Sequence, residues 1–126
     1  MRLPVVLVVS LLVAACAQVP SAPAGLMDVA ARPAEKALLA GIRAYEDAQY
    51  AESEKQLGAA LQAGLASPKD RAAAQKHLAF IYCTSNRTRE CETAFRAARQ
   101  ADPAFALSKS EVGHPLWGPV YKRLAQ

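Results

Sequence analysis

The spacing of apolar residues from position 34 onward predicts a series of α-helices. Alanine-rich segments carry larger apolar residues three or four positions apart, so that each set lies on one side of a helix. The first two predicted helices carry these stripes at Leu38, Ile42 and Tyr45, and at Leu57, Leu61 and Leu65. Between them, Ala48–Tyr50 leaves room only for a tight turn, and the two helices should therefore be antiparallel neighbours.

Capping residues set the limits of a second pair of helices. Ser67 as N-cap, Pro68 in the first turn and Asp70 three residues after the cap predict a helix start. The apolar face of this third helix carries Leu78, Ile81 and Tyr82. The pattern breaks over residues 84–87, and we expect Thr88 to cap a fourth helix carrying Phe95 and Ala98. Asp102-Pro103 should end that helix, because a residue before proline disfavours helical backbone.

The C-terminal segment predicts a short turn and a last helix. Ser108 and Glu111 form a capping box, and Gly113 closes the short turn that follows it. The last helix begins either at Pro115, with His114 as its cap, or later, near Gly118-Pro119. Its apolar stripe comprises Trp117, Val120, Tyr121 and Leu124. We expect this helix to cover the otherwise exposed face of the second pair.

The second pair of helices resembles the tetratricopeptide repeat, a 34-residue pair of antiparallel helices. The matching residues are Leu78, Ala79 and Tyr82 in the first helix, Cys91, Phe95 and Ala98 in the second, and Pro103 at the end. The first pair matches more loosely, at Gly41, Tyr50, Ser53, Leu57 and Ala60. The prediction for residues 34–126 is therefore an all-α domain of two tetratricopeptide-like hairpins and a C-terminal capping helix. A generic alanine-rich array of four helices is the alternative.

The N-terminus has the layout of an export signal. Arg2 precedes an apolar run, and small residues stand directly before Cys16. The run is shorter than the roughly 20 residues that a membrane-spanning helix needs. Val13-Ala14-Ala15-Cys16 resembles the lipobox of bacterial lipoproteins, which implies cleavage of a signal peptide at residues 1–15 and lipid attachment to Cys16. An ordinary secreted protein with a cysteine at this place is the alternative.

The stretch from Cys16 to Pro33 predicts a flexible tether between lipid and domain. Prolines and a glycine interrupt it, and it has no regular periodicity. The alternative is an arm packed on the domain through Leu26, Met27 and Val29. Ala17 follows the lipidated cysteine, and by resemblance to Gram-negative lipoproteins without aspartate there, the destination is the outer membrane, with the domain facing the periplasm.

Charge and motif content argue against nucleic acid binding and catalysis. Removal of Arg2 leaves 14 of the 15 basic residues against 11 acidic ones, interleaved along the chain and without a basic stripe. No nucleophile–base motif or phosphate-binding glycine loop is present, and paired acids such as Glu52/Glu54 and Glu90/Glu92 are typical of solvated helix surface. We expect a non-catalytic protein with no cofactor and no small-molecule substrate.

Cys83 and Cys91 should form a disulfide in an oxidising compartment. They lie near the facing ends of two antiparallel helices, within reach of each other if their Cα atoms approach to about 4.4–6.8 Å. Two buried thiols are the alternative, and a redox-active pair is disfavoured because the spacing is not Cys-x-x-Cys. His77 and His114 match no trusted metal-ligand spacing with these cysteines, so no metal site is predicted.

A longer likeness joins these elements. Phe80-Ile81-Tyr82-Cys83, Cys91 with Phe95, residues 102–107 and Glu111–Gly118 resemble the tetratricopeptide lipoproteins associated with bacterial type VI secretion systems. The resemblance implies an accessory lipoprotein that binds another component of the apparatus through a helical surface. First helices line the concave face of such repeats, which makes Tyr45, His77 and Tyr82 candidate contacts; His114 and Trp117 are further candidates.

Two alternative functions remain open at this stage. One is a pilotin-like lipoprotein that helps to assemble another outer-membrane component. The other is a metal- or redox-active periplasmic protein that uses Cys83, Cys91 and His114.

Overall fold

The computed structural model describes residues 25, 27–28 and 32–126. The predicted signal peptide, Cys16 and most of the predicted tether lie outside these residues. Met27 is 82% exposed, so this residue of the alternative packed arm is not buried on the domain. Leu26 and Val29 lie outside the described residues.

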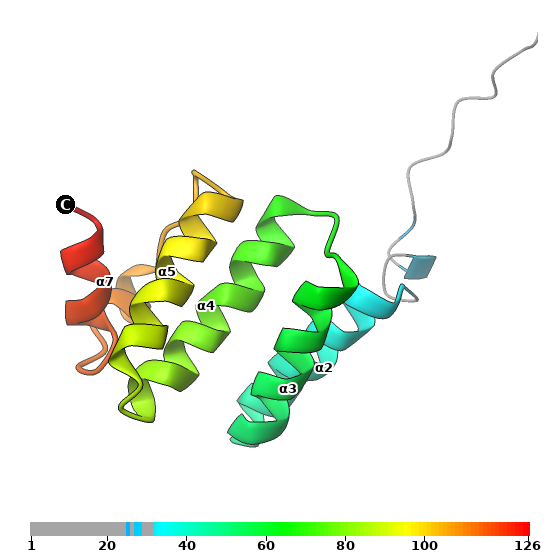
Figure 1. Cartoon of the computed structure of the whole chain (residues 1–126), viewed down its shortest axis with the longest axis horizontal. Helices are drawn as coiled ribbons and strands as arrows, with labels where there is room; N and C mark the ends of the chain where they lie inside the picture. Colours follow the sequence, from blue (N-terminus) through cyan, green and yellow to red (C-terminus); the bar gives the residue numbers. More distant parts are fainter. Residues whose placement is uncertain (1–24, 26, 29–31) are drawn as a thin grey trace, which may run out of the picture.

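The described chain is all-helical, as predicted, and residues 32–126 contain no strand. Its elements are α2 (Pro33–Glu46), α3 (Tyr50–Ala63), α4 (Pro68–Thr84), α5 (Thr88–Ala101), α6 (Lys109–Val112) and α7 (Gly118–Leu124). The pairs α2/α3 and α4/α5 form two antiparallel hairpins that stack through α3 and α4, and α7 covers α5 (Figure 1). Two hairpins and a C-terminal capping helix are therefore the observed arrangement. The first of these helices, α2, begins at Pro33.

Small residues bring the two helices of the first hairpin together. Gly41 lies so close to α3 that an added Cβ would stand 2.8 Å from the Leu57 side chain and 3.1 Å from its backbone nitrogen. The hydroxyl of Ser53, fully buried, donates a hydrogen bond of 2.7 Å to the carbonyl of Gly41. A buried polar group with a partner costs little, whereas an unpaired one is expensive. The positions that matched the repeat loosely thus carry the closest helix contact in this hairpin.

The second hairpin confirms one predicted cap and corrects another. The Ser67 hydroxyl accepts from the Asp70 backbone N–H at 3.3 Å, as expected of an N-cap. Thr88 is not the cap of α5 but its first residue, and Arg87 occupies the cap position without a side-chain hydrogen bond to the helix. The reason is that Asn86 takes a left-handed conformation (φ 60°), and α5 then starts two residues later. Asp102 ends α5 as predicted.

The C-terminal segment folds back as a cap. The Ser108/Glu111 capping box is present. α7 starts at Gly118, the later of the two predicted positions, with Trp117 rather than His114 at its N-cap. Instead, the His114 ring nitrogen Nδ1 accepts from the Leu116 backbone N–H at 3.2 Å. His114 therefore stabilises the loop before the helix through this hydrogen bond, and two residues separate it from the Trp117 cap.

Aromatic rings join the second hairpin to this cap. Phe95 is 1% exposed and makes edge-to-face contacts with Phe80 at 6.2 Å and with Tyr121 at 5.4 Å. The Tyr121 hydroxyl accepts from the Leu107 backbone N–H at 3.2 Å. Such pairs add to the free energy gained from burying the rings. Among the described residues, no helix has the length and apolar character needed to cross a bilayer.

Candidate functional site

Five aromatic or imidazole rings form a continuous row across the first helices of both hairpins and the C-terminal cap. The Tyr45 ring on α2 lies 5.2 Å from His77 on α4, and His77 lies 6.1 Å from Phe80. Phe80 stacks on Trp117 at 4.1 Å, and Trp117 stacks on His114 at 3.3 Å. We call Tyr45, His77, Phe80, Trp117 and His114 the aromatic row. The row connects the first hairpin, the second hairpin and the C-terminal cap.

The members of the aromatic row differ in what they expose. Phe80 and Trp117 are buried, and Trp117 has Phe80 against one face and His114 against the other. The Trp117 indole N–H donates to the Glu111 carbonyl at 2.8 Å. Tyr45, His77 and His114 are only half-buried. Tyr45, His77 and His114 are therefore partly exposed to solvent, whereas Trp117 packs within the cap.

Sequence reasoning missed two parts of this surface. Phe80 links His77 to Trp117, and its position three residues after His77 on one helix was the signal that could have revealed it. The Lys76 ammonium group forms an ion pair of 2.7 Å with Glu111 beside the row. Burial alone would raise the pKa of Glu111, but hydrogen bonds from Lys76 and Ser108 outweigh it and lower the pKa. This ion pair fastens α4 to the capping segment.

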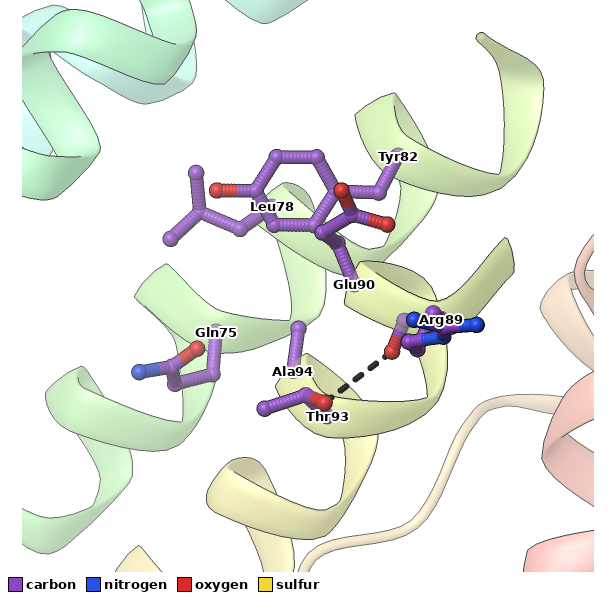
Figure 2. Close-up of a pocket in the computed structure, with 7 residues that line it drawn as sticks. All are labelled: Gln75, Leu78, Tyr82, Arg89, Glu90, Thr93 and Ala94. Carbon is purple, nitrogen blue, oxygen red and sulfur yellow. Dashed lines mark hydrogen bonds between the residues drawn. The ribbon is translucent and has the colours of Figure 1, made fainter. Parts of the chain in front are cut away.

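Tyr82 does not join Tyr45 and His77, contrary to the predicted common groove. Figure 2 shows it beside Leu78 and Glu90 in a groove of about 460 Å³ between α4 and α5. The remaining lining residues are Gln75, Arg89, Thr93 and Ala94. Tyr82 follows His77 by five residues, which turns its side chain well away from that of His77 on a helix with 3.6 residues per turn.

Glu54 is not the solvated surface acid that its sequence predicted. It accepts two hydrogen bonds from the Arg87 guanidinium, at 2.9 and 2.7 Å, and thereby joins α3 to the turn before α5. The hydrogen bond from Arg87 lowers the pKa of Glu54 despite partial burial. Arg87 also lies 4.5 Å from the centre of the Tyr82 ring. The pair spans 33 residues in sequence, so helix periodicity gave no signal for it.

His77 is held neutral within the aromatic row. Burial lowers its pKa below the ordinary value of 6.5, Lys76 lowers it further, and the Ala73 carbonyl, Glu111 and Glu46 act in the opposite direction. Because a carbonyl only accepts, Nδ1 donates the 2.8 Å hydrogen bond to Ala73, and Nε2 is the acceptor in the neutral ring. Burial also raises the pKa of Tyr45. Uncharged rings thus form the centre of the surface.

Acidification should weaken the fold through His77. Its pKa is lower in the folded than in the unfolded chain, so the unfolded chain binds more protons once the pH drops below about 6.5. The free energy of unfolding should fall from that pH downward. His77→Gln should remove this slope in urea titrations between neutral pH and about pH 5. Below about pH 4.5 both proteins should lose further stability, because Glu54 and Glu111 have lowered pKa values. An unchanged slope in the variant would contradict the role of His77.

The predicted cysteine pair is bonded. Cys83 and Cys91 form a disulfide with a Cα–Cα separation of 5.2 Å, and both residues are buried. The bridge joins the last turn of α4 to the first turn of α5. His114, which the metal- or redox-active alternative grouped with these cysteines, stacks on the Trp117 ring. In the described part of the chain no three histidine, cysteine, aspartate or glutamate residues form a group suited to a metal ion.

Removal of the disulfide should destabilise the second hairpin. The bridge spans eight positions, and the chain-entropy estimate for so short a loop is about 2.5 kcal/mol. Cys83→Ala/Cys91→Ala should lower the free energy of unfolding by that amount in urea titrations. Reductant should lower the melting temperature of the wild type and leave the variant unaffected. Equal sensitivity of both proteins to reductant would contradict this prediction.

No known protein family matches this chain, and neither does a curated protein or a solved structure.

Proposed function

We propose that the chain is a non-catalytic accessory lipoprotein of a type VI secretion apparatus that binds a protein partner through a tetratricopeptide-like helical surface. Lipid on Cys16 would hold it at the outer membrane, with residues 34–126 facing the periplasm. The lipobox-like sequence before Cys16 and the resemblance of residues 78–121 to such lipoproteins support this assignment. The Cys83–Cys91 disulfide suits an oxidising compartment.

The aromatic row is the observation that carries the proposed binding role. Rings are enriched at protein interfaces because they bury a large area with few rotatable bonds. Here Tyr45, His77 and His114 stand half-buried on a rigid support, since the core residues Phe80 and Trp117 lie between them. A partner helix or extended peptide laid across α2, α4 and the cap would cover all three. Little ordering of the surface would then be needed on binding, which favours affinity.

The binding role can be tested in the source bacterium by measuring type VI-dependent secretion. A Tyr45→Ala/His114→Ala variant should reduce secretion, because it removes two exposed edges of the aromatic row. Tyr82→Ala is the matched control, a half-buried ring in the separate groove between α4 and α5. Normal secretion by the double variant at normal protein level would reject the row as the contact surface. Loss of an outer-membrane component from that membrane, in the absence of this protein, would favour the pilotin-like alternative instead.

The anchor is tested separately. Cys16→Ser should convert the protein from a membrane-bound to a soluble periplasmic form. The substitution removes the residue that carries the acyl chains, and stable attachment depends on more than one such chain. Fractionation followed by immunoblotting measures this change. Alanine substitution of Ser21, which follows the predicted cleavage site, is the control and should leave the protein in the membrane fraction. Continued membrane association of Cys16→Ser would reject the lipid anchor.

A further inference from the structure

Charge is distributed unequally between the two halves of the domain. Residues 32–66 carry four basic and five acidic side chains, a net charge of −1. Residues 67–126 carry ten basic and five acidic side chains, a net charge of +5. Acidic and basic residues alternate in both halves, so the difference becomes visible only when each half is counted separately. The positive charge belongs to the second hairpin and its cap, at the end of the array away from α2 (Figure 1).

Four of the basic side chains stand on the outer surfaces of α5 and α7. We call Arg89, Arg96, Lys122 and Arg123 the cationic edge; all four are exposed. Arg89 and Arg96 are seven residues apart on α5, two helical turns, so they point in the same direction about 10.5 Å apart. Lys122 and Arg123 belong to the last turn of α7, which packs on α5.

One carboxylate forms ion pairs with members of the cationic edge. Glu92 lies 3.3 Å from the Arg123 guanidinium and 3.9 Å from that of Arg96, so it offsets one positive charge of four. The other acid on α5, Glu90, lines the same groove as Arg89, beside Tyr82 (Figure 2), so the four basic residues of the edge exceed these two carboxylates by two charges. Arg99 is a structural residue, because its guanidinium donates to the Leu124 carbonyl and lies 5.7 Å from the centre of the Tyr121 ring. The cationic edge is therefore free to meet anions in solution.

We propose that the cationic edge docks on the anionic phosphate headgroups of the bilayer to which the protein is anchored. A lipid surface requires positive charge over an area rather than a shaped pocket, and about 1 kcal/mol per basic residue is typical near anionic lipids. The edge consists of long side chains on the outer sides of two helices, with side chains 60% exposed for Arg96 and 58% for Arg123. An acidic protein segment is disfavoured, because nothing in this arrangement fixes the register of a peptide.

The choice of a bilayer as partner rests on the lipid anchor in the proposed function. That anchor keeps the domain within a short tether of a membrane, where even weak attraction acts at high effective concentration. The chain enters the domain at α2, and the cationic edge lies at the opposite end of the array (Figure 1). Lipid at one end and charge at the other would set the long axis of the domain along the membrane. This orientation would fix how the aromatic row is presented to a partner.

The test uses the chain from residue 17 to 126 without lipid, so that the anchor does not contribute. The buried core of the described residues lies between Ala34 and Tyr121, so this chain retains it. Circular dichroism must first show a folded helical domain. Co-sedimentation should then show binding to vesicles of phosphatidylcholine with phosphatidylglycerol, and none to phosphatidylcholine alone. High salt should abolish binding, because it screens exposed charges.

Matched variants locate the binding surface. Arg89→Gln/Arg96→Gln/Lys122→Gln should weaken binding to the anionic vesicles on the order of 100-fold, since each lost charge accounts for about fivefold. The control is Lys36→Gln/Arg43→Gln/Lys55→Gln, which removes three exposed charges from the first hairpin and should bind as the wild type does. Both are measured only if their melting temperatures match the wild type. If the triple variant does not fold, the single variants Arg96→Gln and Lys122→Gln are measured in its place, and each should weaken binding about fivefold.

Three results would overturn the proposal. The first is equal loss of binding in the two triple variants, and the second is binding that ignores phosphatidylglycerol. The third is tighter binding to polyglutamate or to duplex DNA than to the vesicles, which would assign the edge to another class of polyanion. If the cationic edge does not bind vesicles, Cys16→Ser should still move to the soluble fraction. If the lipid anchor is wrong, the lipid-free chain should still bind anionic vesicles. The two failures are thus distinguishable.

Discussion

Gly118→Ala should force α7 away from α6 in the C-terminal cap and destabilise the domain. A Cβ at this position would overlap the carbonyl oxygen of Val112 and lie 3.2 Å from its carbonyl carbon. Both atoms belong to the backbone, so a change of side-chain rotamer cannot relieve the overlap, and α6 and α7 must separate. We expect the free energy of unfolding to fall by about 3 kcal/mol, the upper range for overpacking. Urea titration followed by tryptophan fluorescence measures it, because Trp117 directly precedes the substitution.

Gly58→Ala is the matched control for this prediction. Nothing lies within 4 Å of a Cβ built at Gly58, in the middle of α3, and alanine favours helix over glycine by up to about 1 kcal/mol. The same chemical change should therefore stabilise the domain at Gly58 and destabilise it at Gly118. If Gly118→Ala has wild-type stability, the close approach of α7 to Val112 is wrong. Loss of the cap should also disorder the row from Trp117 to His114, so that partner binding weakens in the same variant.

Phe95→Ala should have the largest effect of any core substitution we consider. The ring is almost fully buried and contacts both Phe80 and Tyr121, so its loss leaves a cavity where the hairpin meets the cap. Phenylalanine-to-alanine changes at such sites cost about 4 kcal/mol. We expect loss of cooperative unfolding at ordinary temperature or a large drop in melting temperature, measured by circular dichroism.

Phe105→Ala serves as the matched control. This ring is half-buried and touches the edge of Tyr121 at 6.3 Å, so the cavity left by its removal is open to water. The cost should be less than half that of Phe95→Ala. Equal costs at the two positions would mean that the second hairpin and the cap do not share one core.

Local signals predicted most of the helices correctly. The Ser67 cap, the end of α5 at Asp102 and the Ser108/Glu111 capping box all depend on residues within three or four positions of each other. The disulfide was predictable for a similar reason, since a short turn brings Cys83 and Cys91 together. The prediction of Thr88 as the N-cap of α5 was wrong. Asn86 takes a left-handed conformation, so the helix starts one residue earlier than predicted, with Arg87 at the N-cap.

Contacts between elements were less predictable. The bidentate Arg87–Glu54 pair joins residues from two hairpins, and nothing in either local sequence indicates the other partner. Tyr82 was assigned to the wrong groove for a different reason: it follows His77 by five positions on α4, and helix periodicity alone turns it about 140° away from His77. Apolar stripes show that a helix has a buried side, but only the stacking angle of the hairpins decides which half-buried residues share a surface.

The sequence by itself determined the helices, their order, the pairing into hairpins and the bonded cysteines, because these depend on spacing within a few turns of the chain. Tertiary structure alone decided that Tyr45, His77, Phe80, Trp117 and His114 form one row, and that Arg123 of α7 meets Glu92 of α5. The physical reason is that packing joins residues far apart in the chain through shape and van der Waals contact. Those forces act only once the helices have met.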